Sequence, residues 1–582
     1  MASSRPSIYV NKIREVVTVK LFREELVRLL AEVVPLEPEE IGADLESPPS
    51  PELGDYAFPC FKLAKLRKTA PGKIAADLAG RISPAPLFAK VEAAGPYLNF
   101  YCDKEKLTEL TLGMIAKEKD QFGHQDQGRG KTVVLDFSAP NIAKPFGIGH
   151  LRSTVIGNSL YRIHAALGYN CVGINHIGDW GTQFGKLIAA YLRWGNPERL
   201  AQEPIEYLYE LYVQFHQEAE TDQTLDDEGR SWFKKLEDGD PQAVELWQRF
   251  RDLSLAEFQR VYSILDVDFD SWQGESFYND MLDKTVAEVS ALGLLQQSQG
   301  AWIVDLEEEG MPPCLLRKQD GATLYATRDL SAAIYRYNTW KFAKMLYVVG
   351  VDQTLHFRQL FAVLKKMGYQ WADACEHIPF GLFRFKEGKM STRQGNLILL
   401  DDVLTKAIEL AGEIIAEKNP ELENREEVAR QVGIGAVIFG DLYNDRIKDI
   451  EFDWEQILDF SGETAPYVQY AHARICSILR KAGRPAGTFA AALLDSEYER
   501  ALVSVLSKFP GVIERAAETC KPSLVARHLV DVAKEFNRFY HQCPVLNAEA
   551  DVRDSRLALV DGVRQVLANG LYLLGIAAPE EM

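Results

Sequence analysis

The sequence predicts an α/β domain built on a parallel sheet, preceded by a small α+β domain and followed by an all-α helical domain. The chain has 582 residues, several times the length of an ordinary domain, so about three or four folding units are expected. From residue 118 to 455 short apolar strands alternate with helical patterns, which is typical of βαβ units in a parallel sheet. From 456 onwards the pattern is helical, with Pro and Gly at the turns. We therefore expect domains at 1–117, 118–455 and 456–582.

Composition places the chain among ordinary globular proteins. Apolar residues make up 47% and charged residues 26%, which excludes a disordered chain, a collagen-like fibre and a coiled-coil rod. No stretch reaches the roughly 18 apolar residues of a membrane helix, and the first residues lack the apolar segment of a secretory signal. The eight cysteines are scattered singly, without a CxxC pair, which favours reduced thiols and argues against a structural zinc site. We expect a cytoplasmic protein with no membrane partner and no structural metal.

The net charge limits the kinds of partner the whole molecule can attract. Lys and Arg number 65 and Asp and Glu number 84, so the formal charge is −19, which disfavours non-specific binding of nucleic acid. Any nucleic-acid partner must therefore be met by local basic patches. The region from 456 to 582 has nearly balanced charges and can accept a polyanion that the rest of the chain repels.

The first 117 residues have the pattern of a small α+β domain. A helical pattern runs from Val16 to Val34, and a Pro-rich break follows at 47–55. A basic helical stretch from Lys62 to Lys73 and an alternating strand at 96–102 complete the domain.

The central region contains two βαβ patterns separated by a largely helical insertion at 190–300, which is rich in Trp, Tyr and charged residues. Ligands of open parallel sheets bind beyond the carboxyl ends of the strands. We therefore expect functional residues in the loops that follow the strands. The predicted strands are 132–137, 171–177, 345–351 and 376–383, and the predicted helices are 149–168 and 353–368.

The segment 136–153, DFSAPNIAKPFGIGHLRS, has the features of a nucleotide-binding loop. It consists of a strand end, a loop with two prolines, and a helix that begins near Gly149. Glycines at such a turn let a flat ligand approach the backbone, and the helix N-terminus beside them can bind phosphate. His150 adds a donor there, and Asp136 and Lys144 converge on the same strand end. The simpler alternative, a polar loop that only caps a helix, does not explain these two charges.

The same segment resembles the HIGH signature of class I aminoacyl-tRNA synthetases, in the SxPNxAKxxxxGHLRS form of arginyl-tRNA synthetases. HIGDWGTQFG at 176–185 resembles that family's loop after the second strand, and KMSTR at 389–393 resembles its KMSKS loop. PELGDYAF at 51–58 and LGIAAPEEM at 574–582 also resemble the family. The resemblance covers essentially the whole chain.

The resemblance implies a Rossmann-like catalytic domain of class I synthetase type and an ATP-dependent ligation of L-arginine to tRNA(Arg). The reaction passes through an arginyl-adenylate, releases AMP and pyrophosphate, uses ATP with Mg²⁺, and in this family requires bound tRNA for activation. The long self-contained chain fits a monomer. No editing segment is evident.

Two departures from the family signatures concern the phosphate site. Gly147 replaces the first histidine of HIGH, and Thr392 replaces the second lysine of KMSKS. The resemblance implies that Lys144 substitutes for that missing lysine, with Arg393 as the alternative donor, because an ammonium can reach the developing charge from either loop. The catalytic residues implied are Lys144, His150, Lys389, Ser391 and Arg393. Those implied for ATP are Lys144, Gly147, Gly149, His150, His176, Gly178, Asp179, Gln183, Lys389, Met390 and Ser391.

An arginine pocket must hold two cationic groups and therefore needs carboxylates. Tyr325 and Asp329 are four residues apart on a predicted helix and share a face. Asp329 can bind a guanidinium through two hydrogen bonds, which lysine cannot match, and Tyr325 can pack on the flat ion. The alternative for Asp329 is an ion pair with Arg328 or Arg336. The arginine-binding residues implied by the resemblance are Asp136, Ser138, Ala139, Pro140, Asn141, His150, Tyr325, Asp329 and Gln353.

The C-terminal helix 464–480 interleaves aromatic and basic side chains that can stack on bases and hold phosphates. We expect tRNA contacts from Tyr467, Tyr470, His472, Arg474 and Arg480, and contacts with the tRNA elbow from Lys65 and Lys68. The alternatives are that the tyrosines belong to the core and that the N-terminal lysines are a solvated face.

Two other functions are compatible with parts of the sequence. A synthetase for glutamate, glutamine or cysteine would share the fold, but the acidic pocket argues against an acidic substrate and no zinc ligands suit cysteine. A catalytically inactive tRNA-binding or scaffold paralogue would explain Gly147 and Thr392. It would not explain Lys144, His150 and the acidic pocket.

Overall fold

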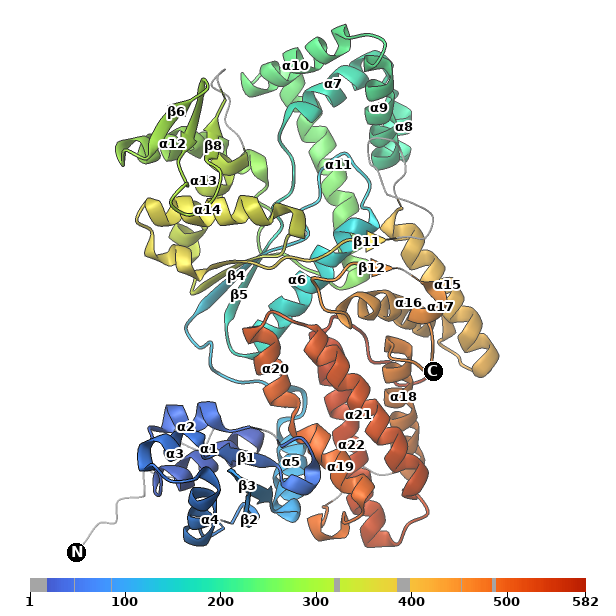
Figure 1. Cartoon of the computed structure of the whole chain (residues 1–582). Helices are drawn as coiled ribbons and strands as arrows, with labels where there is room; N and C mark the ends of the chain where they lie inside the picture. Colours follow the sequence, from blue (N-terminus) through green and yellow to red (C-terminus); the bar gives the residue numbers. More distant parts are fainter. Residues whose placement is uncertain are drawn as a thin grey trace, which may run out of the picture.

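The computed structural model describes residues 18–582 except 47, 85, 319–324, 385–397, 452 and 484–487. An N-terminal unit, a central sheet with a helical extension, and a C-terminal helical bundle follow one another along the chain (Figure 1). Among the described residues, no helix combines the length and the apolar composition needed to cross a membrane.

The N-terminal unit is an antiparallel sheet in the order β1–β3–β2, packed against helices. Phe22, Phe58 and Phe100 are fully buried in its core. The predicted strand at 96–102 is confirmed as β3, but the basic stretch 62–73 is two helices. The chain turns at Lys68, which has a positive φ of 50°, and restarts at Pro71, a residue suited to the first helical turn. The elements are α1 (Thr18–Ala31), α2 (Pro38–Asp44), β1 (Tyr56–Pro59), α3 (Phe61–Arg67), α4 (Pro71–Arg81), β2 (Phe88–Ala94), β3 (Tyr97–Cys102) and α5 (Lys104–Glu118).

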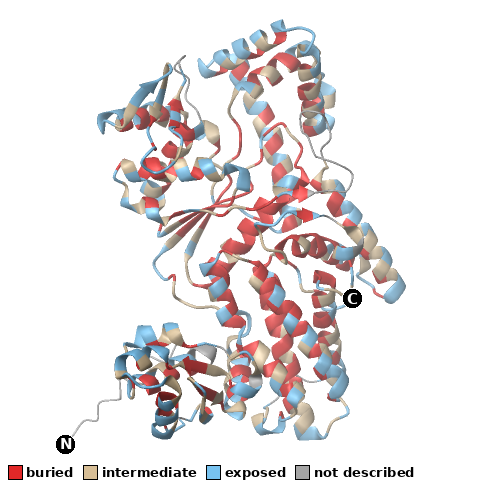
Figure 2. Cartoon of the chain, viewed as in Figure 1, coloured by how far each residue is buried: buried red, intermediate tan, exposed pale blue. Residues whose placement is uncertain are grey.

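The central sheet has the order β10–β9–β4–β5, and every pairing in it is parallel. Its inner strands are buried on both faces, as Figure 2 shows, and Val133, Val134 and Leu135 of β4 are 0% exposed. This is the expectation for a parallel sheet covered by helices. The carboxyl ends of β4, β5 and β9 therefore meet at one edge. The elements are β4 (Thr132–Asp136), α6 (Ile148–Ala166), β5 (Asn170–Ile174), β9 (Lys344–Tyr347), α14 (Thr354–Lys366) and β10 (Cys375–His377).

The prediction of one strand at 376–383 is wrong. Strand β10 ends at His377, and a separate strand β11 (Phe383–Arg384) pairs in parallel with β12 (Ile450–Glu451). Pro379 and Gly381 lie between the two strands, and proline cannot donate a ladder hydrogen bond. The chain thus leaves the main sheet before it enters the segment 385–397.

The insertion is helical as predicted, but it ends in a small antiparallel sheet in the order β6–β7–β8. A helix that carries part of the candidate site, α13, follows this sheet. The elements are α7 (Thr182–Trp194), α8 (Pro197–Gln202), α9 (Pro204–Ala219), α10 (Thr224–Glu237), α11 (Pro241–Leu265), the 3₁₀ helix η4 (Glu275–Met281), α12 (Leu282–Ala291), β6 (Leu295–Ser298), β7 (Ala301–Val304), β8 (Cys314–Arg317) and α13 (Tyr325–Trp340).

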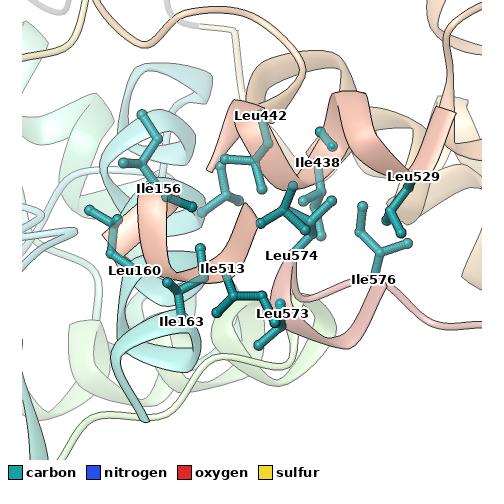
Figure 3. Packing of buried hydrophobic residues seen from close by; sticks show 14 of the residues in the cluster. Ile156, Leu160, Ile163, Ile438, Leu442, Ile513, Leu529, Leu573, Leu574 and Ile576 are labelled. Carbon is teal, nitrogen blue, oxygen red and sulfur yellow. The ribbon is translucent and has the colours of Figure 1, made fainter. Parts of the chain in front are cut away.

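The C-terminal bundle shares one hydrophobic core with helix α6 of the central domain. Figure 3 shows Ile156, Leu160 and Ile163 of α6 packed among side chains of the C-terminal helices, including Ile513 of α20. A displacement of this bundle would therefore also displace α6, the helix whose N-terminus faces the candidate site. The remaining elements are α15 (Leu400–Lys418), α16 (Arg425–Leu442), α17 (Trp454–Ile457), α18 (Ala465–Ala482), α19 (Glu497–Ser507), α20 (Phe509–Glu518), α21 (Ser523–Gln542) and α22 (Ala550–Leu573).

Candidate active site

The loop between β4 and α6 is held in an unusual backbone conformation. Ser138, Ala139 and Ala143 have positive φ angles of 71°, 49° and 58°, which are costly for residues other than glycine and persist only where surrounding contacts enforce them. The Ser138 N–H donates to Ser153 Oγ at 2.8 Å. The Ala143 N–H donates to Ser254 Oγ at 2.8 Å. The loop is thus fixed from α6 on one side and from α11 on the other.

Ser138 lies where the prediction placed it, but its hydroxyl is already engaged. It is buried and hydrogen-bonds Thr154 Oγ1 at 2.8 Å and Tyr262 Oη at 2.7 Å. The structure therefore shows Ser138 shaping the loop.

The predicted loops around 140 and 178 lie side by side. The Gly178 N–H donates to the Pro140 carbonyl at 3.0 Å, and the Ile142 N–H donates to the Gly178 carbonyl at 3.1 Å. A Cβ atom on Gly178 would lie 2.2 Å from Asn141 Oδ1, so any other residue there would force the Asn141 side chain to move. The backbone on both sides of Asn141 is thereby fixed, and its side chain is exposed.

Helix α6 begins beside both ends of the segment that carries the predicted KMSKS-like loop. The Ile148 N–H donates to the Ile398 carbonyl at 3.0 Å, and the Leu400 N–H donates to the Phe146 carbonyl at 2.9 Å. On the other side, the Arg152 guanidinium lies 5.6 Å from the ring of Phe383 in β11. The predicted residues Lys389, Met390, Ser391 and Arg393, together with Thr392, lie outside the described residues.

The N-terminus of α6, which is the predicted phosphate site, has open space at Gly149 and a neutral imidazole at His150. Gly147 caps the helix, and a Cβ atom on Gly149 would have no neighbour within 4 Å. Burial lowers the pKa of His150 to about 4, so its imidazole is neutral near pH 7 and offers a hydrogen bond but no charge. Lys144 holds its ammonium 4.8 Å above the ring of Tyr212 in α9.

The acid at the end of β4 forms a buried ion pair. Arg336 of α13 donates from Nη1 to Asp136 Oδ2 at 2.7 Å, and their side chains are 1% and 8% exposed. Burial opposes the charge of Arg336, but Asp136 and nearby tyrosines raise its pKa well above the ordinary value. Asp136 is therefore linked to a cation of the protein itself.

Asp329 lies two helical turns earlier on α13 and has different partners. His356 Nε2 of α14 is 2.6 Å from Asp329 Oδ2, and His176 Nε2 is 3.9 Å from Oδ1. The proposed alternative, pairing with Arg328 or Arg336, is wrong: Arg336 pairs with Asp136, and Arg328 donates to Asn279 Oδ1 at 3.3 Å. Burial acts to raise the pKa of Asp329, but the hydrogen bond and charges of His356, His176 and Arg336 outweigh it and lower this pKa. The carboxylate remains 26% exposed.

Tyr325 lies at the start of α13, the helix that carries Asp329, and Gln353 precedes α14, the helix that carries His356. Tyr325 is the first residue of α13 and is 60% exposed. Gln353 is exposed and precedes the first residue of α14. Both side chains are accessible, and Gln353 follows β9 in the chain, as the sequence predicted.

Asp179 lies in the loop that is predicted to line the ATP site through backbone atoms, and its side chain has partners within the protein. Its side chain is fully buried, and its carboxylate accepts hydrogen bonds from Ser276 and from Arg251. Its carbonyl accepts from Trp247 Nε1 at 2.8 Å. Asp179 therefore anchors the loop, because no surface of its side chain is available to a ligand. Gln183 and His176 remain partly exposed.

The C-terminal residues divide into exposed and buried ones. Arg474 lies 4.7 Å from the ring of Tyr470 and 5.6 Å from that of Tyr540, and both rings are more than a third exposed. Asn537 joins them to Tyr467: it accepts from Arg474 Nη1 and donates to Tyr467 Oη, each at 2.9 Å.

The prediction that His472 contacts tRNA is wrong, because it is 3% exposed and hydrogen-bonds the Pro579 carbonyl through Nδ1 at 2.9 Å. Arg480 is exposed but pairs with Glu581 at 3.1 Å and so helps to hold the chain end. Lys65 and Lys68 are exposed on the N-terminal unit.

Three residues near the site were not predicted from the sequence. They are Arg336, which had been considered only as a partner of Asp329, and His356 and Glu275. Burial is the main cause that raises the pKa of Glu275 to about 7, and the negative charges of Asp329 and Asp179 also act to raise it. The position of His356, three residues after Gln353 on a predicted helix, was the one available signal. Within the described residues no group of three or more His, Cys, Asp or Glu side chains could hold a metal ion.

Comparisons with known proteins agree across the whole chain. The family model described as "tRNA synthetases class I (R), catalytic domain" matches residues 111–454. The models "Arginyl tRNA synthetase N terminal domain" and "DALR anticodon binding domain" match 20–102 and 468–582.

Individual relatives cover almost all of the chain. Arginine–tRNA ligase 1 of Bacillus thuringiensis subsp. konkukian is 55% identical over 92% of this chain and 95% of its own. The arginine–tRNA ligase of Clostridium perfringens is 50% identical over 96% and 100%. The solved arginyl-tRNA synthetase of Thermus thermophilus aligns with a TM-score of 0.83 and 28% identity, covering 97% of this chain and all of its own.

The parallel sheet, the loop and helix at its carboxyl edge, and the catalytic-domain match define a class I aminoacyl-tRNA synthetase, and the class implies the use of ATP. Within that class the chain belongs to the arginyl-tRNA synthetase family, whose substrates are arginine, ATP and tRNA. The predicted family, fold class and enzymatic function are confirmed.

Proposed function

We propose that the chain charges tRNA(Arg) in two steps at the carboxyl edge of the central sheet. A carboxylate oxygen of arginine attacks the α-phosphorus of MgATP, and pyrophosphate leaves. A terminal ribose hydroxyl of the tRNA then attacks the carbonyl carbon of the arginyl-adenylate, and AMP leaves. No protein nucleophile is required, so the residues act by positioning and electrostatics.

The observation that carries this proposal is the partly exposed carboxylate of Asp329 beside the exposed ring of Tyr325. Its partners among the described residues are imidazoles, so a guanidinium can still approach. A substrate guanidinium would bind Asp329 through two hydrogen bonds and stack on Tyr325. A lysine substrate would leave part of this acceptor unpaired.

The remaining arginine contacts come from the loop after β4 and from Gln353. Asn141 is exposed there, and the backbone of Ser138, Ala139 and Pro140 is fixed by the hydrogen bonds described above. Asp136 contributes negative charge at the strand end, moderated by Arg336. His150 borders both the arginine and the ATP sites.

We propose that ATP phosphates bind over Gly147 and Gly149, with His150 donating a hydrogen bond and Lys144 supplying charge. Supporting this, the N-terminus of α6 is open at Gly149 and a helix N-terminus favours anions. His176, Gly178 and Gln183 would contact the nucleoside. Lys389, Met390, Ser391 and Arg393 would act from the opposite side of the phosphates.

The tRNA would contact both ends of the molecule. Tyr470, Arg474 and Tyr467 form a connected polar and aromatic surface on α18 that suits unstacked bases. Arg480 borders it, and Lys65 and Lys68 would meet the tRNA elbow. We further propose domains at 1–117, 118–455 and 456–582 and a monomeric state. We also propose a cytoplasmic location, supported by the eight unpaired cysteines.

The experiment that tests the phosphate-side assignment is Lys144→Ala. We expect tRNA charging at saturating substrates to fall by about 10²-fold, the usual loss for one transition-state charge contact, with the arginine KM nearly unchanged. Lys341→Ala is the matched control, because Lys341 also holds its ammonium over a tyrosine ring, at 5.0 Å, but lies just after the last residue of α13. Wild-type activity in Lys144→Ala would contradict the assignment. Pyrophosphate exchange should also require tRNA, and full exchange without it would refute that requirement.

A further inference from the structure

Asp329, an acid of the proposed arginine pocket, is hydrogen-bonded to an imidazole that can titrate. His356 Nε2 donates to Asp329 Oδ2 at 2.6 Å, and the two side chains are 23% and 26% exposed. A carboxylate has about four lone-pair directions, so this bond uses one of them and leaves the others for a ligand. It also restrains the rotation of the carboxylate.

We propose that His356 is a positioning residue that sets the orientation and effective charge of Asp329, and through them the affinity of the enzyme for arginine. The inference rests on the proposed function, in which Asp329 binds the guanidinium. A neutral His356 orients a full negative charge toward the substrate. A protonated His356 makes the same hydrogen bond but cancels that charge.

The sign of the pH dependence follows from these contacts. Burial acts to lower the pKa of His356, but the hydrogen bond and charge of Asp329 outweigh it and raise this pKa above the ordinary value. His356 therefore becomes protonated, as the pH falls, at a higher pH than an ordinary histidine does. Arginine binding and protonation of His356 oppose each other, and this coupling is reciprocal. The KM for arginine must rise as the pH falls.

Other charged and titratable groups face the pair from the surrounding elements. Around Asp329 these are His176 after β5, Glu275 in η4, Cys314 in β8, Arg336 in α13 and Tyr347 in β9. His377 of β10 faces His356. Arg336 stays charged, and burial raises the pKa of Cys314 and of Tyr347, which leaves them neutral in this range. Glu275, with a pKa of about 7, also loses negative charge as the pH falls and is the main competing explanation.

The test compares arginine KM and kcat at about pH 8 and about pH 6, with ATP and tRNA saturating, in the wild type and four variants. For the wild type we expect KM to rise roughly tenfold on acidification, which corresponds to about 1.4 kcal/mol of lost attraction, with little change in kcat. His356→Gln keeps a donor at the Nε2 position but cannot titrate. Its KM should stay near the wild-type value at the higher pH and lose most of the rise.

The variants Glu275→Gln and His377→Asn are the controls for the pH effect. His377 is a matched imidazole that stacks on Phe357 and hydrogen-bonds the Val349 carbonyl, away from Asp329. We expect both to retain the wild-type rise in KM. An unchanged rise in His356→Gln, or its loss in Glu275→Gln instead, would overturn the inference.

Asp329→Asn separates this inference from the proposed function. If Asp329→Asn raises the arginine KM strongly while His356→Gln keeps the full pH response, the pocket is right and the role of His356 is wrong. If Asp329→Asn leaves the KM unchanged at both pH values, the pocket assignment fails first, and the inference fails with it.

Discussion

Helix α13 carries two charged side chains, two turns apart, whose environments are opposite. Arg336 is 1% exposed and pairs with Asp136 at 2.7 Å across the end of β4. Asp329 is 26% exposed and pairs with a histidine that can lose its charge. The buried pair joins a carboxylate to a guanidinium and fixes the sheet edge. The partly exposed pair leaves lone-pair directions of Asp329 open and is therefore suited to a ligand. One helix thus carries both a residue that stabilises the sheet edge and a residue that is available to a ligand.

The largest expected effect is on the buried pair. Arg336→Ala leaves Asp136 as an unpaired buried charge, which typically costs about 3–5 kcal/mol. We expect a clear fall in the thermal unfolding midpoint, measured by circular dichroism. Asp329→Asn should change stability by less than about 1 kcal/mol, because its ion pair is partly solvated. Equal destabilisation by the two variants would contradict the distinction between the pairs.

The partly exposed pair, Asp329 and His356, should dominate the affinity for arginine. Asp329→Asn removes the charge that holds the guanidinium, and we expect the arginine KM to rise by about 10²-fold, or about 2.7 kcal/mol. The measurement is tRNA charging with labelled arginine at saturating ATP and tRNA. Asp283→Asn is a suitable control, since Asp283 pairs with Arg317 at the surface. An unchanged arginine KM in Asp329→Asn would refute the proposal that Asp329 binds the guanidinium of arginine.

A smaller effect is expected at the C-terminal surface formed by Tyr470, Arg474 and Tyr467. This surface is far from helix α13 in the sequence, so a change there tests whether the affinity for arginine depends only on the residues around Asp329. Arg474→Ala should raise the KM for tRNA by about tenfold, in the range for one stacking or cation–π contact with a base. The arginine KM should not change. A rise in the arginine KM alone would indicate that the surface acts through the fold.

The sequence predicted the alternation of strands and helices in the central domain, and it predicted that Tyr325 and Asp329 share one helix, which α13 confirms. It could not assign partners that come from distant elements. Asp136 and Arg336 are 200 residues apart, and His356 reaches Asp329 from another helix. Two errors had local signals: Pro71 marks the second basic helix, and Pro379 and Gly381 separate β10 from β11. The burial of Asp179 and His472 had no such local signal. A polar residue in a loop or on a helix looks the same in the sequence whether it is buried or exposed, until its neighbours in the fold are known.

The most direct test of the central claim is a crystal structure of the enzyme with arginine bound. The account predicts the guanidinium within hydrogen-bond distance of Asp329 and stacked on Tyr325, with the Asp136–Arg336 ion pair still formed. Arginine bound away from Asp329, or a substrate guanidinium that replaces Arg336 at Asp136, would contradict it.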